Sequence, residues 1–275
     1  MTVRRGERRE DVVYRLFAEV ARAKEGAASL LVLDGEPLLE AALEAAVDAG
    51  AGVKIRGVLW NVSVIGEPHV QGLKQVLEQR QTPFEVVPPE RLVRLGVAHA
   101  VPTVLVLVEK RVEEGVSVEG LLRRGARRML LVDSVEDPMN VGVILRTAEA
   151  FDYTVLAAGS TAPLLSRRVA RSSTGSALRM PLYRSDLDPP RLIDGWRAGG
   201  GLAVTTSAHG RAAVGEVPWR LPHLIVVGNE RHGLAAATRA AAGWDVRIPM
   251  PGRAHSLNVT VATGILLQAA LAATR

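Results

Sequence analysis

The sequence predicts an α/β protein of two domains, for two reasons. Short apolar stretches alternate with segments whose apolar residues recur at helical spacing, which is typical of a parallel sheet covered by helices on both faces. A charged, glycine-punctuated stretch at 112–128, typical of a linker or a short helix between domains, interrupts this alternation, and a chain of 275 residues is long enough for two cores. We expect a first, small α/β domain over 1–109, a linker over 110–126 and a second domain over 127–275.

The first domain is predicted to begin with a helix at 11–23, because the apolar residues of this segment share one helical face. A second helix, at 37–50, starts with a proline and ends at a glycine, and a third is expected around 70–80. Pro102 is acceptable in a strand only at its beginning. The strands predicted for this domain are 30–33, 53–60, 84–87 and 101–109.

The second domain alternates more steeply between apolar strands and helices. Its predicted strands are 129–135, 153–159, 201–207, 223–229 and 244–250. Its predicted helices are 140–151, 231–242 and 257–273. Strands as continuously apolar as these are buried on both faces, which indicates a parallel sheet.

Composition narrows the class of protein. Hydrophobic residues make up 48% and charged residues 23%, as in ordinary globular proteins. No apolar stretch approaches the ~20 residues that a membrane-spanning helix needs, and the arginine-rich N-terminus lacks the apolar run of a secretory signal. We therefore expect a cytoplasmic protein. The lack of cysteine excludes disulfides and thiol catalysis, and the six histidines lack metal-site spacing, so no metal is expected.

The charge balance is basic, with a net charge of +5 and an isoelectric point near 10. Such a balance favours a polyanionic partner, because each neutralised phosphate releases counterions. High-GC coding would also enrich arginine, so composition alone leaves both explanations open. The aromatic content of 4% favours recognition of backbone and shape over base stacking.

Three loops of the second domain follow predicted strands, which is where ligands bind in open α/β sheets. In the first loop Pro138 forces a turn, so Asn140 is a candidate N-cap and Arg146 lies nearly two turns into the next helix. In the second loop Gly228 lets a ligand approach the backbone, and Glu230 stands at a predicted helix start. Taken singly, either loop is also explained as an ordinary helix start.

The third loop, 248–258, is polar, although it follows a buried strand and precedes a very apolar helix. Ser256 or Asn258 could serve simply as the cap of that helix. A glycine-rich turn of the common Rossmann type is excluded, because G-A-G at 50–52 and G-G-G at 199–201 precede strands instead of following them.

The three loops together carry spaced motifs: N-x-G-x-x-x-R-T-A at 140–148, V-V-G-N-E at 226–230 with Gly233, and I-P-M-x₅-S-L-N-V at 248–259. They resemble the motifs of the SpoU (TrmH-like) branch of the SPOUT RNA 2′-O-ribose methyltransferases, over residues 126–275. The stretch 168–182, with Ser173 and Gly175, resembles the segment that links these motifs. The first hundred residues resemble the ribosomal-protein-like substrate-binding domain that several members carry, in element order only.

The resemblance implies a SPOUT domain with a deep trefoil knot, S-adenosylmethionine as cofactor, and methylation of a ribose 2′-hydroxyl, with 23S ribosomal RNA as the expected substrate. It implies a catalytic arginine, Arg146, supported by Asn140, Glu230, Ser256 and Asn258. It implies that the cofactor lies against Thr205, Thr206, Gly228, Ile248, Met250, Leu257 and Asn258. RNA contacts are expected from two arginine clusters: Arg123, Arg124, Arg127 and Arg128, and Arg167, Arg168 and Arg171. Members dimerise through the knot, so Arg171 is a candidate to act in the partner's site.

The catalytic arginine is not expected to act as a base, because a guanidinium with a pKa above ~12 hardly releases its proton. We expect Arg146 to stabilise the developing alkoxide and to hold a neighbouring phosphate. Two alternatives stay open: the same chemistry on transfer RNA, which the N-terminal domain disfavours, and a non-catalytic RNA-binding protein, which the five intact site residues disfavour. The residues do not separate a housekeeping role from antibiotic resistance.

Overall fold

The computed structural model describes residues 12–22, 29–95 and 100–274. It divides into two compact units. Unit 1 comprises 1–111 and 165–179, and unit 2 comprises 112–164 and 180–275. The segment 165–179, which the sequence prediction assigns to the second domain, is thus grouped with unit 1. Within the described part of the chain, no helix is long and apolar enough to cross a membrane.

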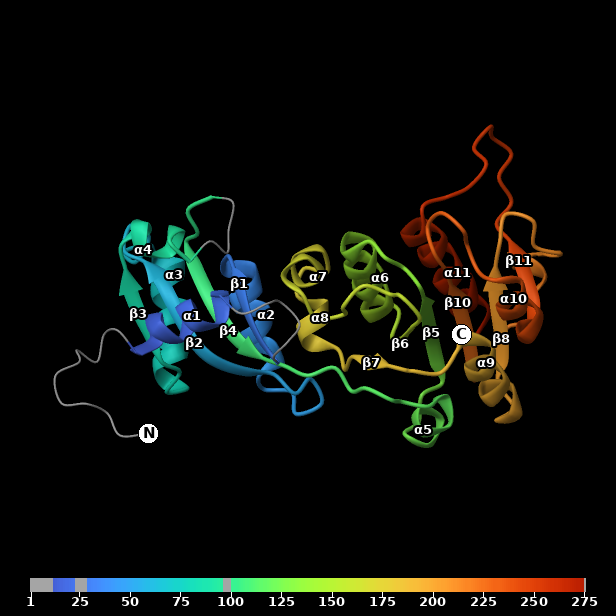
Figure 1. The fold of residues 1–275 in the computed structure, drawn as a ribbon, viewed down its shortest axis with the longest axis horizontal. Helices are drawn as coiled ribbons and strands as arrows, with labels where there is room; N and C mark the ends of the chain where they lie inside the picture. Colours follow the sequence, from blue (N-terminus) through green and yellow to red (C-terminus); the bar gives the residue numbers. More distant parts are fainter. Residues whose placement is uncertain (1–11, 23–28, 96–99, 275) are drawn as a thin grey trace. The chain divides into compact units, whose positions relative to one another are not determined.

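Unit 1 contains a mixed four-stranded sheet with the order β1-β4-β2-β3, where β4 is antiparallel to both β1 and β2, and β2 is parallel to β3 (Figure 1). The strands are β1 (Leu30–Asp34), β2 (Lys54–Asn61), β3 (Phe84–Val87) and β4 (Val104–Glu109). Four helices of unit 1 precede β4 in the chain: α1 (Val12–Arg22), α2 (Glu36–Ala45), α3 (Pro68–Gln79) and α4 (Pro89–Val93). All four strands match predicted ones, whereas the one-turn helix α4 was not predicted.

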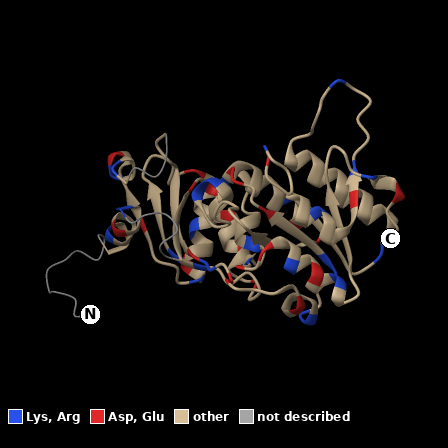
Figure 2. Cartoon of the chain, turned by 45° about the vertical axis from the view of Figure 1, so that its right-hand side comes forward, with Lys and Arg blue, Asp and Glu red and all other residues tan. Residues whose placement is uncertain are grey.

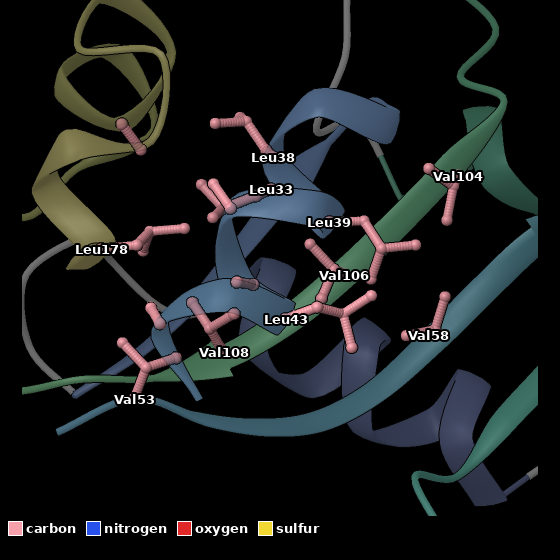
Figure 3. Packing of buried hydrophobic residues seen from close by; sticks show 14 of the residues in the cluster. Leu33, Leu38, Leu39, Leu43, Val53, Val58, Val104, Val106, Val108 and Leu178 are labelled. Atoms are coloured by element: carbon pink, nitrogen blue, oxygen red, sulfur yellow. The ribbon is translucent and has the colours of Figure 1, made fainter. Parts of the chain in front are cut away.

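Two short helices from the middle of the chain, α7 (Arg167–Ser172) and α8 (Ser176–Arg179), complete the core of unit 1. Leu178 packs in the same cluster as Leu33 and Leu38 (Figure 3). Gly175 has a φ of +84°, and a Cβ at this position would overlap the Cβ of Ala41 in α2. A glycine is therefore required where α8 meets α2.

Lys110 lies at the end of β4 and is almost fully buried. Its ammonium group donates hydrogen bonds to the carbonyl oxygens of Ala51, at 2.6 Å, and Leu178, at 2.9 Å. Burial lowers the pKa of Lys110 to about 8, although the carboxylate of Asp48 acts in the opposite direction. The lysine therefore ties α8 to the β-sheet of unit 1.

Unit 2 contains a seven-stranded sheet with the order β7-β6-β5-β10-β8-β11-β9, in which every strand pair is parallel. Its strands are β5 (Arg128–Asp133), β6 (Thr154–Ala158), β7 (Tyr183–Arg184), β8 (Leu202–Thr206), β9 (Ala212–Ala213), β10 (His223–Val227) and β11 (Gly243–Arg247). Its helices are α5 (Val118–Arg123), α6 (Pro138–Ala150), α9 (Pro189–Ala198), α10 (Ala236–Ala242) and α11 (Val259–Ala273), with a 3₁₀ turn at Val214–Glu216. The predicted parallel sheet is confirmed; the knot stays a prediction from the resemblance.

The stretch expected to be a linker or a short helix contains the short helix α5 and is folded onto unit 2. Ser117 caps α5 by accepting a hydrogen bond from the backbone N–H of Gly120, and Val118 and Leu121 are buried. Glu113 pairs with the β7 edge as an isolated parallel bridge to Tyr183. The glycine-punctuated residues 112–126 therefore contribute to the core and to the sheet edge of unit 2.

A buried polar cluster lies at the amino ends of the central strands of unit 2. The Nε2 atom of His223 is 2.6 Å from the hydroxyl oxygen of Tyr153, and the ring of Trp219 stands edge-on to the imidazole. Burial lowers the pKa of His223 to about 4, with the Arg128 charge acting in the same direction and a hydrogen bond to the Arg220 carbonyl acting against it. His223 is thus neutral in the folded protein at neutral pH.

We expect this histidine to make unit 2 sensitive to acid. Its folded pKa is lower than its unfolded value, so the unfolded chain binds the additional proton below pH 6.5 and stability falls as the pH is lowered from 6.5 towards 4. Between pH 7 and pH 5 the loss is about 2 kcal/mol. Urea unfolding of the wild type and of His223→Asn at both pH values tests this. The pH-dependent loss should shrink by about that amount in the variant, and equal losses in both proteins would contradict the assignment.

Candidate functional site

A cavity of about 610 Å³ opens at the carboxyl ends of β8, β10 and β11 in unit 2. Its walls come from the segments that follow these strands, from the first turn of α6 and from the start of α11. Nine of the residues expected at the site line it: Asn140, Thr206, Gly228, Glu230, Ile248, Met250, Ser256, Leu257 and Asn258. The three loops that carry the motifs therefore meet at one cavity, as expected for the carboxyl edge of a parallel sheet.

Hydrogen bonds join the three loops directly. The side-chain amide of Asn140 donates to Glu230 Oε1 at 2.9 Å, and the amide of Asn258 donates to Asn140 Oδ1 at 3.4 Å. Asn140 comes from α6, Glu230 from the turn after β10, and Asn258 from the residue before α11. Asn140 therefore links the other two loops, because it donates a hydrogen bond to Glu230 and accepts one from Asn258.

Glu230 is anchored as a carboxylate. It also accepts hydrogen bonds from the backbone N–H groups of Glu136 at 3.3 Å and Asp137 at 3.2 Å. Partial burial would raise the pKa of Glu230, but the bonds from Asn140 and from the two backbone groups outweigh burial and lower the pKa. A carboxylate whose oxygens already accept these hydrogen bonds is better suited to holding the loops together than to accepting a proton.

Two local predictions were wrong. Asn140 does not cap α6, because the helix begins at Pro138 and Asp137 is its cap, with its carboxylate accepting the Met139 N–H at 2.9 Å. The side chain of Asn140 is therefore available to the cavity. Glu230 does not stand at a helix start, since α10 begins only at Ala236.

The turn before α10 is organised by Asn229. Its side-chain oxygen accepts the backbone N–H groups of Arg231 at 2.9 Å and His232 at 3.1 Å, and its amide donates to the Ser134 carbonyl at 2.9 Å. Gly233 closes the turn with a φ of +65°. This asparagine-centred turn occupies the residues for which the sequence predicted a first helical turn.

At the third loop, Asn258 is the N-cap of α11, and its side-chain oxygen accepts the Thr260 N–H at 2.8 Å. The loop itself extends away from the body of unit 2 (Figure 1). Its apolar residues Ile248, Met250 and Leu257 contribute to the cavity wall. Asn258 therefore serves as a helix cap and also reaches the site, so the two explanations of this residue are compatible.

The family model described as "SpoU rRNA Methylase family" matches residues 127–268. The chain belongs to the SpoU rRNA methylase family. The match covers β5 to α11, and thus the three loops and the cavity that they enclose.

This SpoU protein is similar in sequence to two named enzymes. It is 37% identical over 144 residues to the 23S rRNA (guanosine(2553)-2'-O)-methyltransferase RlmP of Bacillus subtilis, covering 52% of this chain and 57% of that protein. It is 32% identical over 205 residues to the 23S rRNA (uridine(2479)-2'-O)-methyltransferase of Streptomyces viridochromogenes, covering 71% of this chain and 70% of the other. The match to RlmP thus spans little more than half of that relative's length.

Solved structures extend the similarity to nearly the whole chain. The crystal structure of an RNA 2'-O ribose methyltransferase has 28% identity and a TM-score of 0.73, covering 94% of this chain and 95% of the other. The SpoU methyltransferase AviRb from Streptomyces viridochromogenes, in complex with AdoMet, has 25% identity and a TM-score of 0.74, covering 95% and 98%. The small α/β unit before the SpoU domain is therefore part of the shared architecture.

The cavity of this SpoU domain fits S-adenosylmethionine. Its volume falls within the roughly 300–1,000 Å³ of small-molecule sites, and it combines an apolar wall with a few polar groups. Gly228 lies where the backbone of β10 enters the cavity, and a Cβ there would lie 2.6 Å from a Leu234 methyl carbon and 2.9 Å from the Gly233 carbonyl carbon. A larger residue would therefore overlap the Gly233–Leu234 turn, and both residues of this turn line the cavity.

Two of the expected site residues do not line the cavity. Thr205 is fully buried, and its hydroxyl donates to the Trp244 carbonyl at 3.1 Å, so its part in the site is limited to the backbone and to support. Arg146 lies six residues beyond Asn140 on α6, which is about 9 Å of helical rise. It stands on the exposed side of the helix, outside the set of cavity-lining residues.

Sequence reasoning missed six polar residues of the cavity wall: Ser207, His209, Asn229, Arg231, His232 and Arg239. The first two directly follow β8, so the rule that ligands bind beyond strand ends could have identified them. Arg239 belongs to α10, and no local pattern connects it with the cavity.

The expected RNA-binding arginines fall into both units, and basic residues are interspersed with acidic ones (Figure 2). Arg171 is paired with Asp34 at the end of β1, Arg124 with Glu113 at 2.7 Å, and Arg128 with Asp152 at 3.4 Å. The other members of the two clusters are Arg123, Arg127, Arg167 and Arg168. Of these four, Arg167 is partly buried and the rest are exposed.

Proposed function

We propose that this protein methylates the 2′-hydroxyl of a ribose in 23S ribosomal RNA, with S-adenosylmethionine as methyl donor. The observation that carries the proposal is the cavity at which Asn140, Glu230 and Asn258, one residue from each motif loop, are joined by hydrogen bonds. The sulfonium of the cofactor supplies an activated methyl group. The protein has to bind the ribose, orient its hydroxyl and stabilise the charge that develops on the oxygen.

The residues divide this work. Glu230 and Asn140 hold the motif loops together, and Ser256 lies at the cavity wall as a hydroxyl that can orient the ribose. Arg146 stabilises the developing alkoxide and the adjacent phosphate, because its guanidinium stays charged and offers a planar fork. Gly228, Ile248, Met250 and Leu257, with the backbone of Thr205 and Thr206, hold the cofactor.

The choice of ribosomal RNA rests on the relatives. Both named enzymes above are 23S rRNA 2'-O-methyltransferases. Such a substrate implies a cytoplasmic protein. The exposed arginines Arg123, Arg127 and Arg168, with the partly buried Arg167, are the proposed contacts to the RNA backbone, because the planar fork of a guanidinium matches a phosphate.

The deciding assay is methyl transfer from radiolabelled S-adenosylmethionine to separate pools of ribosomal and transfer RNA, followed by digestion to nucleosides. Label in a 2′-O-methyl nucleoside of ribosomal RNA is the expected result. Label in transfer RNA alone would keep the chemistry and overturn the substrate. Label in neither pool would favour a non-catalytic RNA-binding protein.

We further propose a homodimer formed through α6 and α11, which pack against each other. Four large apolar side chains on these helices are exposed: Met139, Val143, Val261 and Ile265. They are spaced four residues apart on each helix, so each pair forms one stripe. Arg146 follows Val143 by three residues and shares its side of α6, so a second copy on this surface would lie beside the catalytic arginine.

Breaking the stripe should dissociate the dimer. We expect the double variant Val261→Glu, Ile265→Glu to elute as a monomer in size-exclusion chromatography with light scattering, because two buried charges per protomer cannot be compensated in an apolar interface. Val47→Glu, at an exposed valine of unit 1, is the matched control and should remain a dimer. A wild type that is monomeric at micromolar concentration would contradict the proposal.

A further inference from the structure

The cavity continues beyond the motif loops to the carboxyl ends of β8 and β11. There its wall is formed by Ser207 and His209, which follow β8, and by Arg239, which projects from α10. The described contacts place α10 against both β8 and β11. None of these three residues belongs to the motifs, and the function proposed above assigns them no role.

The guanidinium of Arg239 is held in place by a backbone carbonyl and a carboxylate. Its Nη1 donates to the Leu234 carbonyl at 2.6 Å, and its Nε lies 3.7 Å from Asp245 Oδ2. Asp245 also accepts a hydrogen bond from the hydroxyl of Ser207, at 3.0 Å, and lies 3.2 Å from the hydroxyl of Thr205, which it shares with the Trp244 carbonyl. One carboxylate therefore fixes both Arg239 and the serine beside it in the wall of the cavity.

A guanidinium fixed in this way is suited to an anion. It is half-buried, so little side-chain freedom is lost when it binds a ligand, and its planar fork matches a carboxylate or a phosphate. Of the groups that the proposed function brings to this cavity, the cofactor carries one carboxylate, at its amino-acid end, and the RNA carries phosphates. The two sources share the same chemistry and differ in where they come from.

Position in the sheet favours the carboxylate. Asn140 and Glu230 follow β5 and β10, and the cavity then extends one strand further to β8, about 5 Å away, where Ser207 and Arg239 lie. In the cofactor a short carbon chain separates the methyl-bearing sulfonium from the carboxylate. A polymer phosphate would more readily meet the exposed Arg231 and His232 at the rim than a half-buried arginine.

We propose that Arg239 binds the carboxylate at the amino-acid end of S-adenosylmethionine, and that Asp245 is a positioning residue which holds Arg239 and Ser207 in place. This inference rests on the proposed function, because it takes the cofactor as given. It assigns the β8–β11 end of the cavity to the amino-acid part of the cofactor, and it assigns the loop 248–257 to the remainder.

The test is calorimetric binding of S-adenosylmethionine and of decarboxylated S-adenosylmethionine to the full chain. We expect the wild type to bind the carboxylated ligand about 10–100-fold more tightly, the range of a charge-assisted hydrogen bond. Arg239→Met should abolish this preference by weakening the carboxylated ligand alone. Asp245→Asn should reduce the preference by a smaller factor, and Arg239→Lys should restore part of it.

Arg197 offers a matched control, since it also donates to a backbone carbonyl, that of Ala241 in α10 at 2.7 Å, but lies outside the cavity wall. Arg197→Met should leave both affinities unchanged. Equal weakening of both ligands by Arg239→Met would show a structural role and overturn the proposal, as would a wild type that does not discriminate between them. Unchanged cofactor affinity with weakened RNA binding would assign the arginine to a phosphate instead. A wild type that binds neither ligand would overturn the proposed function itself.

Discussion

Arg146→Ala is expected to lower the rate of methyl transfer by about 10²–10³-fold while leaving the affinity for S-adenosylmethionine unchanged. The rate falls because one preorganised donor to a developing negative charge contributes a factor of this size. The affinity is retained because Arg146 lies outside the set of residues that line the cavity. The fold should persist, since the side chain is exposed on α6. Single-turnover kinetics with saturating cofactor, together with calorimetric cofactor binding, measure the two effects separately.

Arg146→Lys distinguishes the possible roles of the arginine. If positive charge alone stabilises the alkoxide, lysine should recover part of the lost rate, whereas a bidentate contact to phosphate would be recovered poorly. A loss of cofactor affinity equal to the loss of rate would contradict the assignment, because the arginine would then act through the cofactor site. Unchanged methyl transfer in Arg146→Ala would remove Arg146 from the catalytic residues.

The sheets could be predicted from the sequence because buried strands are marked by continuous runs of apolar residues. Strands such as His223–Val227 are apolar at nearly every position, and all of their residues are buried between layers. The sequence of α9 also shows a helical pattern, because the buried residues Leu192, Ile193 and Trp196 recur at helical spacing after two prolines. The sequence prediction nevertheless contains no helix at these residues. The late start of α10 was not recoverable in this way, because side-chain bonds from Asn229 replace the first helical turn.

Only those residues of the candidate site that belong to a spaced motif could be predicted from the sequence. Asn140, Glu230 and Asn258 carry a motif and do meet at the cavity, although the hydrogen bonds between them join residues about 90 to 118 positions apart. Arg239 and Asp245 carry no motif, and their place in the wall follows from how α10 packs on β8 and β11. The pairing of Arg171 with Asp34 likewise depends on tertiary structure, because 165–179 belongs to unit 1.

Gly210→Ala is expected to destabilise unit 2 by about 3 kcal/mol or more, which is at the upper end of single-substitution effects. Gly210 is buried in the loop between β8 and β9. A Cβ there would lie 2.5 Å from the backbone nitrogen of Arg247 and nearer still to the carbonyl carbon of Val246. The obstruction is the backbone of β11, which cannot rotate away as a side chain could. Thermal unfolding should show a lower midpoint, by several degrees.

The same substitution should also affect the cavity, because the loop that Gly210 closes carries Ser207 and His209. If the loop moves off β11 to relieve the overlap, the hydrogen bond from the Ser207 N–H to the Val246 carbonyl, now 3.0 Å, is lost. Cofactor affinity should then fall even at temperatures where the variant stays folded. Gly215→Ala is the matched control, since a Cβ at Gly215 would meet no atom within 4 Å, and its midpoint should stay near that of the wild type. A Gly210→Ala protein with wild-type stability would mean that the loop and β11 separate easily in solution, and the wall of the cavity would then have to be regarded as adaptable.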